Sequence, residues 1–251
     1  MSSANDAFIG KGKVYLENLT RGGGLRRVGN VSALDFSIEN ESVEQRDYTG
    51  AGGNSAVISR PSTVAVAMTM LSMSARNIAM AIRGTIDELV AAPVSGESHT
   101  GNPGALIAFS KVPNPSETVT VTIDPGGTPV NAVAGTHYDR TDSGILLLDH
   151  VDVTPGVDIS VDYTSLSGDV VEAMTSAGDE YRLVFEGLNE AKSKQRVVVE
   201  VHRMVWTPTS GMGFISDDFA ELPLEGSVLS DPSITSAGKS QFFRVTYVDL
   251  P

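Results

Sequence analysis

Three carboxylates and a hydroxyl recur at every second position of one polar stretch: Asp35, Ser37, Glu39 and Glu41. Pairs of carboxylates can hydrolyse glycosidic bonds when two different environments separate their pKa values, so that one serves as acid and the other as base or nucleophile. A spacing of two instead places all four side chains in one row on one face of a strand. The row therefore indicates an acidic surface, and we do not expect an enzyme.

Other catalytic and metal-binding patterns do not occur in the sequence. The four histidines lack metal-ligand spacing, there is no cysteine, and neither a Gly-x-Ser-x-Gly elbow nor a Rossmann glycine pattern is present. The stretches 137–139 and 149–152 could surround a hard cation, but charged residues in turns are usually only solvated. We therefore expect no catalytic residue, no cofactor and no metal ligand.

A glycine-rich stretch between arginines, Arg21-Gly-Gly-Gly-Leu-Arg-Arg27, invites comparison with a phosphate-binding loop. The Gly-Lys-Ser/Thr ending that such a nucleotide loop needs is missing. Because glycines favour turns, we interpret the stretch as the tip of a hairpin.

Composition limits the possible partners. The chain has 251 residues, 41% of them hydrophobic, and a formal net charge of −13. Proteins that grip nucleic acid neutralise phosphates with Lys and Arg, so this chain is expected to repel DNA rather than to bind it. The N-terminus lacks a secretory signal pattern, and the longest apolar run, 64–73, is too short to span a bilayer. We expect a soluble protein made in a cytoplasm.

The acidic row lies in a predicted strand over 28–44 that returns through a second strand over 62–71. Leu34, Phe36 and Ile38 alternate with the acidic row and are predicted to face a core. On the returning strand, an apolar set alternates with a small uncharged set: Val64, Val66, Met68 and Met70 against Thr63, Ala65, Ala67 and Thr69. The glycine-rich stretch 45–60 between the two strands is predicted to be a long structureless loop.

The remaining pattern is mainly β. A helix over 75–84 is expected after an N-cap at Ser72 or Ser74. Further strands are predicted at 13–19, 181–187, 195–206, 222–229 and 241–248, and short strands at 105–110, 118–123, 145–148 and 157–163. Stretch 95–104 has the composition of a linker. We predict an all-β sandwich or barrel with one flanking helix, formed by 1–94 and 181–251, with a small β-rich insertion at 95–180.

The order and residues of these elements resemble the major tail (tail tube) proteins of long-tailed bacteriophages, most nearly those of Mu-like siphophages. The resemblance covers about two thirds of the chain. It is carried by the following stretches: the strand 28–41, the loop Asp47-Tyr-Thr-Gly-Ala-Gly-Gly-Asn54, the helix Ala75-Arg-Asn-Ile-Ala-Met-Ala-Ile-Arg-Gly84, Val205-Trp-Thr-Pro208 and 218–231.

The resemblance implies a tail-tube-type fold and a structural role in the virion. Such subunits form hexameric rings, each subunit gives two hairpins to an inner β-barrel, and stacked rings hold the tape measure protein before they conduct DNA. Tail tip and terminator proteins would be further partners, DNA would pass without specific binding, and no membrane insertion is implied. Assembly would take place in the host cytoplasm.

Carried onto this chain, 31–44 and 62–72 would form one inner hairpin, and strands near 196–206 and 221–230 the other. The residues expected to line the lumen are Asp35, Ser37, Glu39, Glu41, Thr63, Ala65, Ala67, Thr69 and Glu225. The residues expected in an inter-ring stacking loop are Asp47, Tyr48, Gly50, Gly52, Gly53 and Asn54. Two alternatives remain: a carbohydrate- or surface-binding β-sandwich, and a hydrolase with an Asp/Glu pair.

Overall fold

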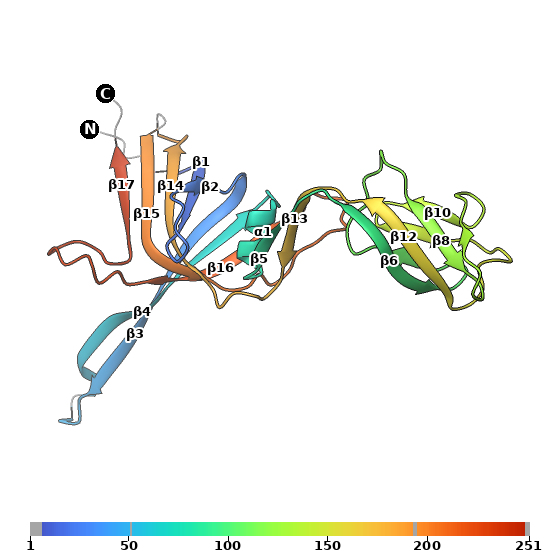
Figure 1. Cartoon of the computed structure of the whole chain (residues 1–251). Coiled ribbons are helices and arrows are strands. Elements are labelled where there is room, and N and C mark those ends of the chain that lie inside the picture. The colour runs from blue at the N-terminus through green and yellow to red at the C-terminus, as the bar shows by residue number, and fades with distance from the viewer. Residues whose placement is uncertain (1–6, 51, 193–194, 249–251) are drawn as a thin grey trace. The chain divides into compact units, whose positions relative to one another are not determined.

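The computed structural model describes residues 7–50, 52–192 and 195–248. The chain divides into two compact units, shown in Figure 1. The core unit comprises Met1–Ile86 and Val171–Pro251, and the inserted unit comprises Asp87–Val170. Both consist of antiparallel sheets, so the chain is mainly β. The predicted insertion, 95–180, began and ended later in the chain than the inserted unit does.

The core unit contains one eight-stranded sheet with the order β2-β1-β14-β15-β16-β4-β3, and β17 also pairs with β15. Its strands are β1 (Gly10–Asn18), β2 (Arg26–Arg27), β3 (Val31–Arg46), β4 (Asn54–Met70), β14 (Glu180–Asn189), β15 (Gln195–Trp206), β16 (Leu222–Leu229) and β17 (Phe243–Val248). β17 pairs with the first half of β15, and β16 pairs with its last four residues. Among the described residues the sheet ends at β2 and β3 and does not close into a barrel.

The apolar residues of β3, β4 and β16 form one side of the main core, as their alternation predicted. Val66, Met68 and Met70 of β4 are almost completely buried, and Leu224 of β16 lies opposite Met68. Phe36 stacks on Phe243 of β17 with 5.4 Å between ring centroids. The prediction was wrong for Ile38, which is 55% exposed. The pairing of β4 with β16 ends at Ala65, so beyond that point no other described strand lies beside β3 and β4.

The distal parts of β3 and β4 form a two-stranded arm, residues 40–61, which extends away from the sheet in Figure 1. The predicted loop over 45–60 was therefore wrong, because Gln45 pairs with Ala56 and Val43 pairs with Ile58. The glycines are concentrated near the tip, and the residues on either side can all adopt an extended conformation. The tip is closed by a hydrogen bond from the Asp47 amide to the Gly53 carbonyl, 2.9 Å long.

The helix α1 (Ala75–Ala81) packs against the main core through Met80 and Ala81. Ser74, one of the two residues predicted as N-cap, caps the helix and accepts a hydrogen bond from the Asn77 amide. Asn77 is buried, and its side-chain amide donates to the carbonyls of Val28 and Ser72 at 2.7 and 2.8 Å. These bonds fasten the helix to the segments on either side of the β3–β4 hairpin. No helix among the described residues is long and apolar enough to cross a membrane.

The inserted unit is a small sandwich of two sheets around a second core. One sheet has the order β10-β11-β7 and the other the order β6-β12-β8-β9. The strands are β6 (Pro93–Gly101), β7 (Leu106–Ala108), β8 (Thr120–Asp124), β9 (Val130–Asn131), β10 (Tyr138–Thr141), β11 (Gly144–Leu147) and β12 (Val157–Thr164). Ile145 and Leu147 of one sheet share this core with Ile123 and Val161 of the other.

Stretch 95–104 was predicted to be a linker, but most of it belongs to β6. Its backbone pairs with β12 from Val157–Gly101 to Thr164–Pro93. A two-stranded sheet of β5 (Thr85–Leu89) and β13 (Gly168–Glu172) accompanies the chain where it enters and leaves the inserted unit. The glycines and polar residues of β6 hid its strand character, because such a strand carries little hydrophobic alternation.

We predict that Asn77→Ala lowers the free energy of unfolding of the core unit by about 2 kcal/mol. The substitution removes the side-chain amide that now donates to the Val28 carbonyl in a buried bond and to the Ser72 carbonyl in a part-buried one. Chemical denaturation followed by Trp206 fluorescence measures the change. Asn40→Ala, which removes an exposed amide in the arm, is the control and should leave stability nearly unchanged. Equal effects of both substitutions would contradict the fastening role of Asn77.

Candidate functional site

Carboxylates and small residues share the outer face of the three strands β3, β4 and β16. Asp35 lies opposite Ala67 of β4, and Ala67 lies opposite Glu225 of β16. In the next row, Ala65 of β4 lies opposite both Ser37 of β3 and Ser227 of β16. The structure therefore brings together five of the predicted lumen residues in these two rows, and the paired residues Glu39 and Thr63 extend the rows along the hairpin. We call this surface, made by Asp35, Ser37, Glu39, Thr63, Ala65, Ala67, Thr69 and Glu225, the acidic face.

The acidic face contains no cation of its own. Arg203 of β15 is the nearest arginine along the pairing of β15 with β16, and it is held by Glu180 through bonds of 3.0 and 2.7 Å. Glu41, by contrast, lies in the arm opposite Arg60. The row of carboxylates without a cationic neighbour thus ends at Glu39, before the fourth residue of the predicted row.

The residues predicted for a stacking loop lie at the tip of the arm. Tyr48 is 88% exposed, and Gly50, Gly52 and Gly53 adopt positive φ angles that glycine tolerates without strain. The Asp47 side chain accepts hydrogen bonds from the amide and the hydroxyl of Thr49, which lower the pKa of Asp47. Asn54 already belongs to β4. The loop at the tip is therefore short, and most of the exposed hairpin consists of the paired strands of the arm.

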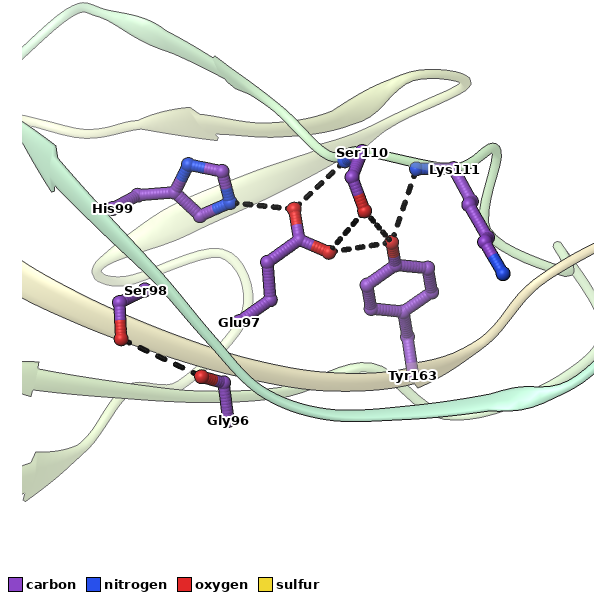
Figure 2. Close-up of polar contacts among 7 residues, drawn as sticks. All are labelled: Gly96, Glu97, Ser98, His99, Ser110, Lys111 and Tyr163. Carbon is purple, nitrogen blue, oxygen red and sulfur yellow. Dashed lines mark hydrogen bonds and ion pairs between the residues drawn. The ribbon is translucent and has the colours of Figure 1, made fainter.

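The inserted unit holds a second polar cluster, centred on Glu97 of β6 and shown in Figure 2. The Glu97 carboxylate accepts from the amide and hydroxyl of Ser110, both at 2.7 Å, and from the Tyr163 hydroxyl at 2.8 Å. His99 Nε2 lies 2.8 Å from Oε1, the oxygen that also accepts the Ser110 amide, and the Glu97 side chain is only 14% exposed. Burial raises the pKa of Glu97, but the bonds from Ser110, Tyr163 and His99 together outweigh it and lower the pKa to about 2.

The order of contacts in the Glu97 cluster decides what it can do. In a serine triad the histidine lies between the hydroxyl and the carboxylate, so that it can take the hydroxyl proton. Here Ser110 and His99 each contact Glu97 directly. The cluster instead joins β6, β12 and the segment after β7 through one carboxylate. The residues of the cluster come from separate segments of the chain, and no local sequence motif predicts that they meet.

Two histidines and an aspartate meet in the same unit. His137 Nε2 and His150 Nδ1 lie 3.5 and 3.4 Å from Asp152 Oδ2. Of the two stretches considered for a cation, Asp139 and Asp149 are not among the three residues that converge. His137 Nδ1 accepts the Val133 amide and His150 Nδ1 accepts the Asp152 amide. Because both Nδ1 atoms accept backbone amides, each neutral imidazole ring carries its proton on Nε2. A protonated Nε2 has no free lone pair for a metal ion, so this arrangement does not favour metal binding by Nε2.

The fold and these surfaces define a mainly β protein with two antiparallel units and an extended two-stranded arm. The chain belongs to the family described as "Protein of unknown function UCP028589", which matches residues 7–246. No curated protein matches the chain.

We predict that acid destabilises the inserted unit through Glu97. Because the folded pKa lies below the ordinary value of 4.5, the stabilisation is fully present above about pH 5 and is lost as the pH falls toward 2. Hydrogen-exchange protection of peptides from 87–170, taken relative to the intrinsic exchange rate at each pH, should therefore fall across this range. Glu97→Gln should weaken the unit by about 1–3 kcal/mol at neutral pH and reduce the acid dependence.

Glu88→Gln, at an exposed position of β5, serves as the matched control for Glu97→Gln. It should leave both stability and acid dependence unchanged. If Glu97→Gln retained the full acid dependence of the natural protein, another group would be responsible for it.

Proposed function

We propose that the protein is a structural virion subunit that assembles as stacked, hexameric rings into the tail tube of a phage. The acidic face then lines the lumen through which DNA passes, with tape measure and tail tip or terminator proteins as further partners. The observation that carries the proposal is the continuity of two features on one hairpin. The acidic face occupies its proximal part, and the exposed arm forms its distal part.

The acidic face suits a channel for a polyanion. Asp35 and Glu225 lie on either side of Ala67, and the side chains between them are small or uncharged. Phosphates are attracted by Lys and Arg and repelled by carboxylates, so a surface of this kind does not retain DNA. The same repulsion acts between subunits, and salt therefore promotes their association by screening it.

The arm supports the assembly part of the proposal. An isolated two-stranded hairpin is only marginally stable in water. This one exposes Val43, Val57, Ile58 and Tyr48, and both of its edges are unpaired among the described residues. Unpaired edges and exposed apolar side chains are the features that pairing with further strands would cover. Neighbouring copies of the chain would supply such strands in a ring or a stack of rings.

The inserted sandwich gives the alternative of a carbohydrate-binding module no comparable support. Sugar-binding surfaces expose aromatic rings, whereas Phe109, Tyr138 and Tyr163, the three aromatic residues of the inserted unit, are all buried. Trp206, the single tryptophan, is 2% exposed and belongs to the main core.

We predict that Val43→Asp combined with Ile58→Asp abolishes assembly and leaves the monomer folded. The two residues pair across the arm and are exposed, so their replacement removes apolar contact area without disturbing a core. Circular dichroism verifies folding, and light scattering with negative-stain microscopy at high protein and salt concentration measures assembly.

The matched control is Ser42→Asp with Ser59→Asp, which adds the same charge at the adjacent cross-strand pair. This variant should still assemble, although it needs more salt. The proposal fails if the natural protein remains monomeric under all of these conditions. If both double variants assembled equally, the arm would have no role in association.

We further predict that Asp35→Lys with Glu225→Lys permits tube formation but makes the tubes retain duplex DNA. The change converts the centre of the acidic face into a cationic surface. Retention should weaken steeply with salt, because it depends on release of counterions from phosphate. Co-sedimentation of labelled DNA with tubes measures it.

Asp217→Lys with Asp218→Lys makes the same change in net charge at two exposed positions outside the acidic face. This control should retain less DNA than the variant of the acidic face when DNA is added during tube assembly. Equal retention by the two variants would contradict the lumen assignment.

A further inference from the structure

A cavity of about 330 Å³ lies in the core unit beside the turn between β1 and β2. Residues of α1, the segment before β14 and Trp206 complete its wall. Four arginines and a single carboxylate line it: Arg21, Arg26, Arg76, Arg83 and Asp179. In a chain with a net charge of −13, such a concentration of cations is unexpected.

The single carboxylate is already engaged. Asp179 Oδ2 accepts from Arg21 Nε and from the Asn18 amide, each at 2.8 Å. Arg83 donates to two main-chain carbonyls, at 2.9 Å to Trp206 and 3.4 Å to Ala177. Arg26 and Arg76 make no ion pair with any described carboxylate. The cavity therefore holds an excess of positive charge that the described residues of the core unit do not neutralise.

This excess carries a cost in the free protein. Burial and the neighbouring charge of Arg76 lower the pKa of Arg26, while Tyr181 opposes the shift. A partly buried cation beside another cation loses hydration and gains repulsion, so the pair destabilises the fold unless an anion joins it. A cluster with a purely structural role would not need this desolvation and repulsion, because a neutral residue could take the place of Arg26.

Two further donors in the wall have no partner. Trp206 is 2% exposed and its indole N–H is buried without a hydrogen bond, and so is Nε of Arg83. Both nitrogen atoms are inaccessible to solvent, so the binding of an anion depends on the other guanidinium donors of the cavity. Arg83 also adopts a φ of +50°, a conformation that favours glycine, so its backbone is strained in the place that brings its side chain to the cavity.

We propose that this cavity is an oxyanion-binding site, which takes the carboxylate or phosphate group of a small molecule. Guanidinium groups present paired N–H donors that match the oxygens of both groups, and the anion would neutralise Arg26 and Arg76. The volume suits a small ligand rather than a polymer. The inference is independent of the proposed self-assembly, because every residue in it belongs to one copy of the core unit.

The stretch Arg21–Arg27 acquires a role in this site. Gly22, Gly23 and Gly24 adopt φ angles of 75°, 112° and 72°, which let the chain turn at the rim of the cavity. The turn separates Arg21, which is paired, from Arg26, which is not. The stretch lacks the ending of a nucleotide loop, and its arginine side chains rather than its backbone provide the recognition.

Titration of the full chain with pyrophosphate and with citrate, at constant ionic strength, tests the proposal. Trp206 is the single tryptophan and lines the cavity, so its fluorescence reports on this site. We expect a saturable change with at least one probe. Arg26→Gln should weaken binding about ten-fold or more, since it removes a charged hydrogen-bond donor. Without the anion, the melting temperature of this variant should equal or exceed that of the natural protein.

Arg27→Gln is the matched control, because Arg27 follows Arg26 in β2 but does not line the cavity. It should bind as the natural protein does. Arg76→Gln, on the exposed surface of α1, provides a second test should Arg26→Gln fail to fold. Binding of pyrophosphate alone would assign a phosphate ligand, and of citrate alone a carboxylate. Absence of saturable binding, or equal weakening by Arg26→Gln and Arg27→Gln, would overturn the proposal.

Discussion

The alternation of side chains across β3, β4 and β16 is the constraint on which the core unit depends. Val66, Met68 and Met70 must all point into the core, and their cross-strand neighbours Leu34, Phe36 and Leu224 must follow the same register. A slip of one residue would bring Asp35 and Glu225 into the core and expose the apolar set. The acidic face is therefore fixed in place by the packing on the opposite side of the sheet.

That coupling explains which elements could be predicted from the sequence. The strand over 64–70 and the long strand Gln195–Trp206 could be predicted because their buried residues form a regular apolar pattern in the sequence. The arm and β6 do not, because neither carries a regular apolar face. Their strand conformation comes from backbone pairing with a neighbour, which composition does not reveal. Ile38 shows the reverse error, since its apolar character suggested burial at a point where the sheet has already narrowed to two strands.

The polar sites also differ in whether a local sequence pattern predicts them. Neighbouring positions on one strand sufficed to predict the acidic face, because period two relates sequence to geometry directly. Glu97, Ser110 and Tyr163 come from three separate segments, and nothing in their spacing predicts that they meet. The arginine-lined cavity could be predicted only in part. The stretch Arg21–Arg27 was visible in the sequence, whereas the approach of Arg76 in α1 and of Arg83 just after it depends on how the helix packs.

Within the core unit, the acidic face and the arginine-lined cavity thus carry unpaired charges of opposite sign, and stability does not account for that arrangement. Exposed ion pairs contribute little to folding, so bringing Arg26 or Arg76 beside a carboxylate would gain only modestly. Holding Arg26 partly buried beside Arg76, however, imposes desolvation and repulsion that a different placement would avoid. The carboxylates of the acidic face and the unpaired arginines of the cavity both fit the roles proposed for them: the face would repel a polyanion, and the cavity would hold an oxyanion.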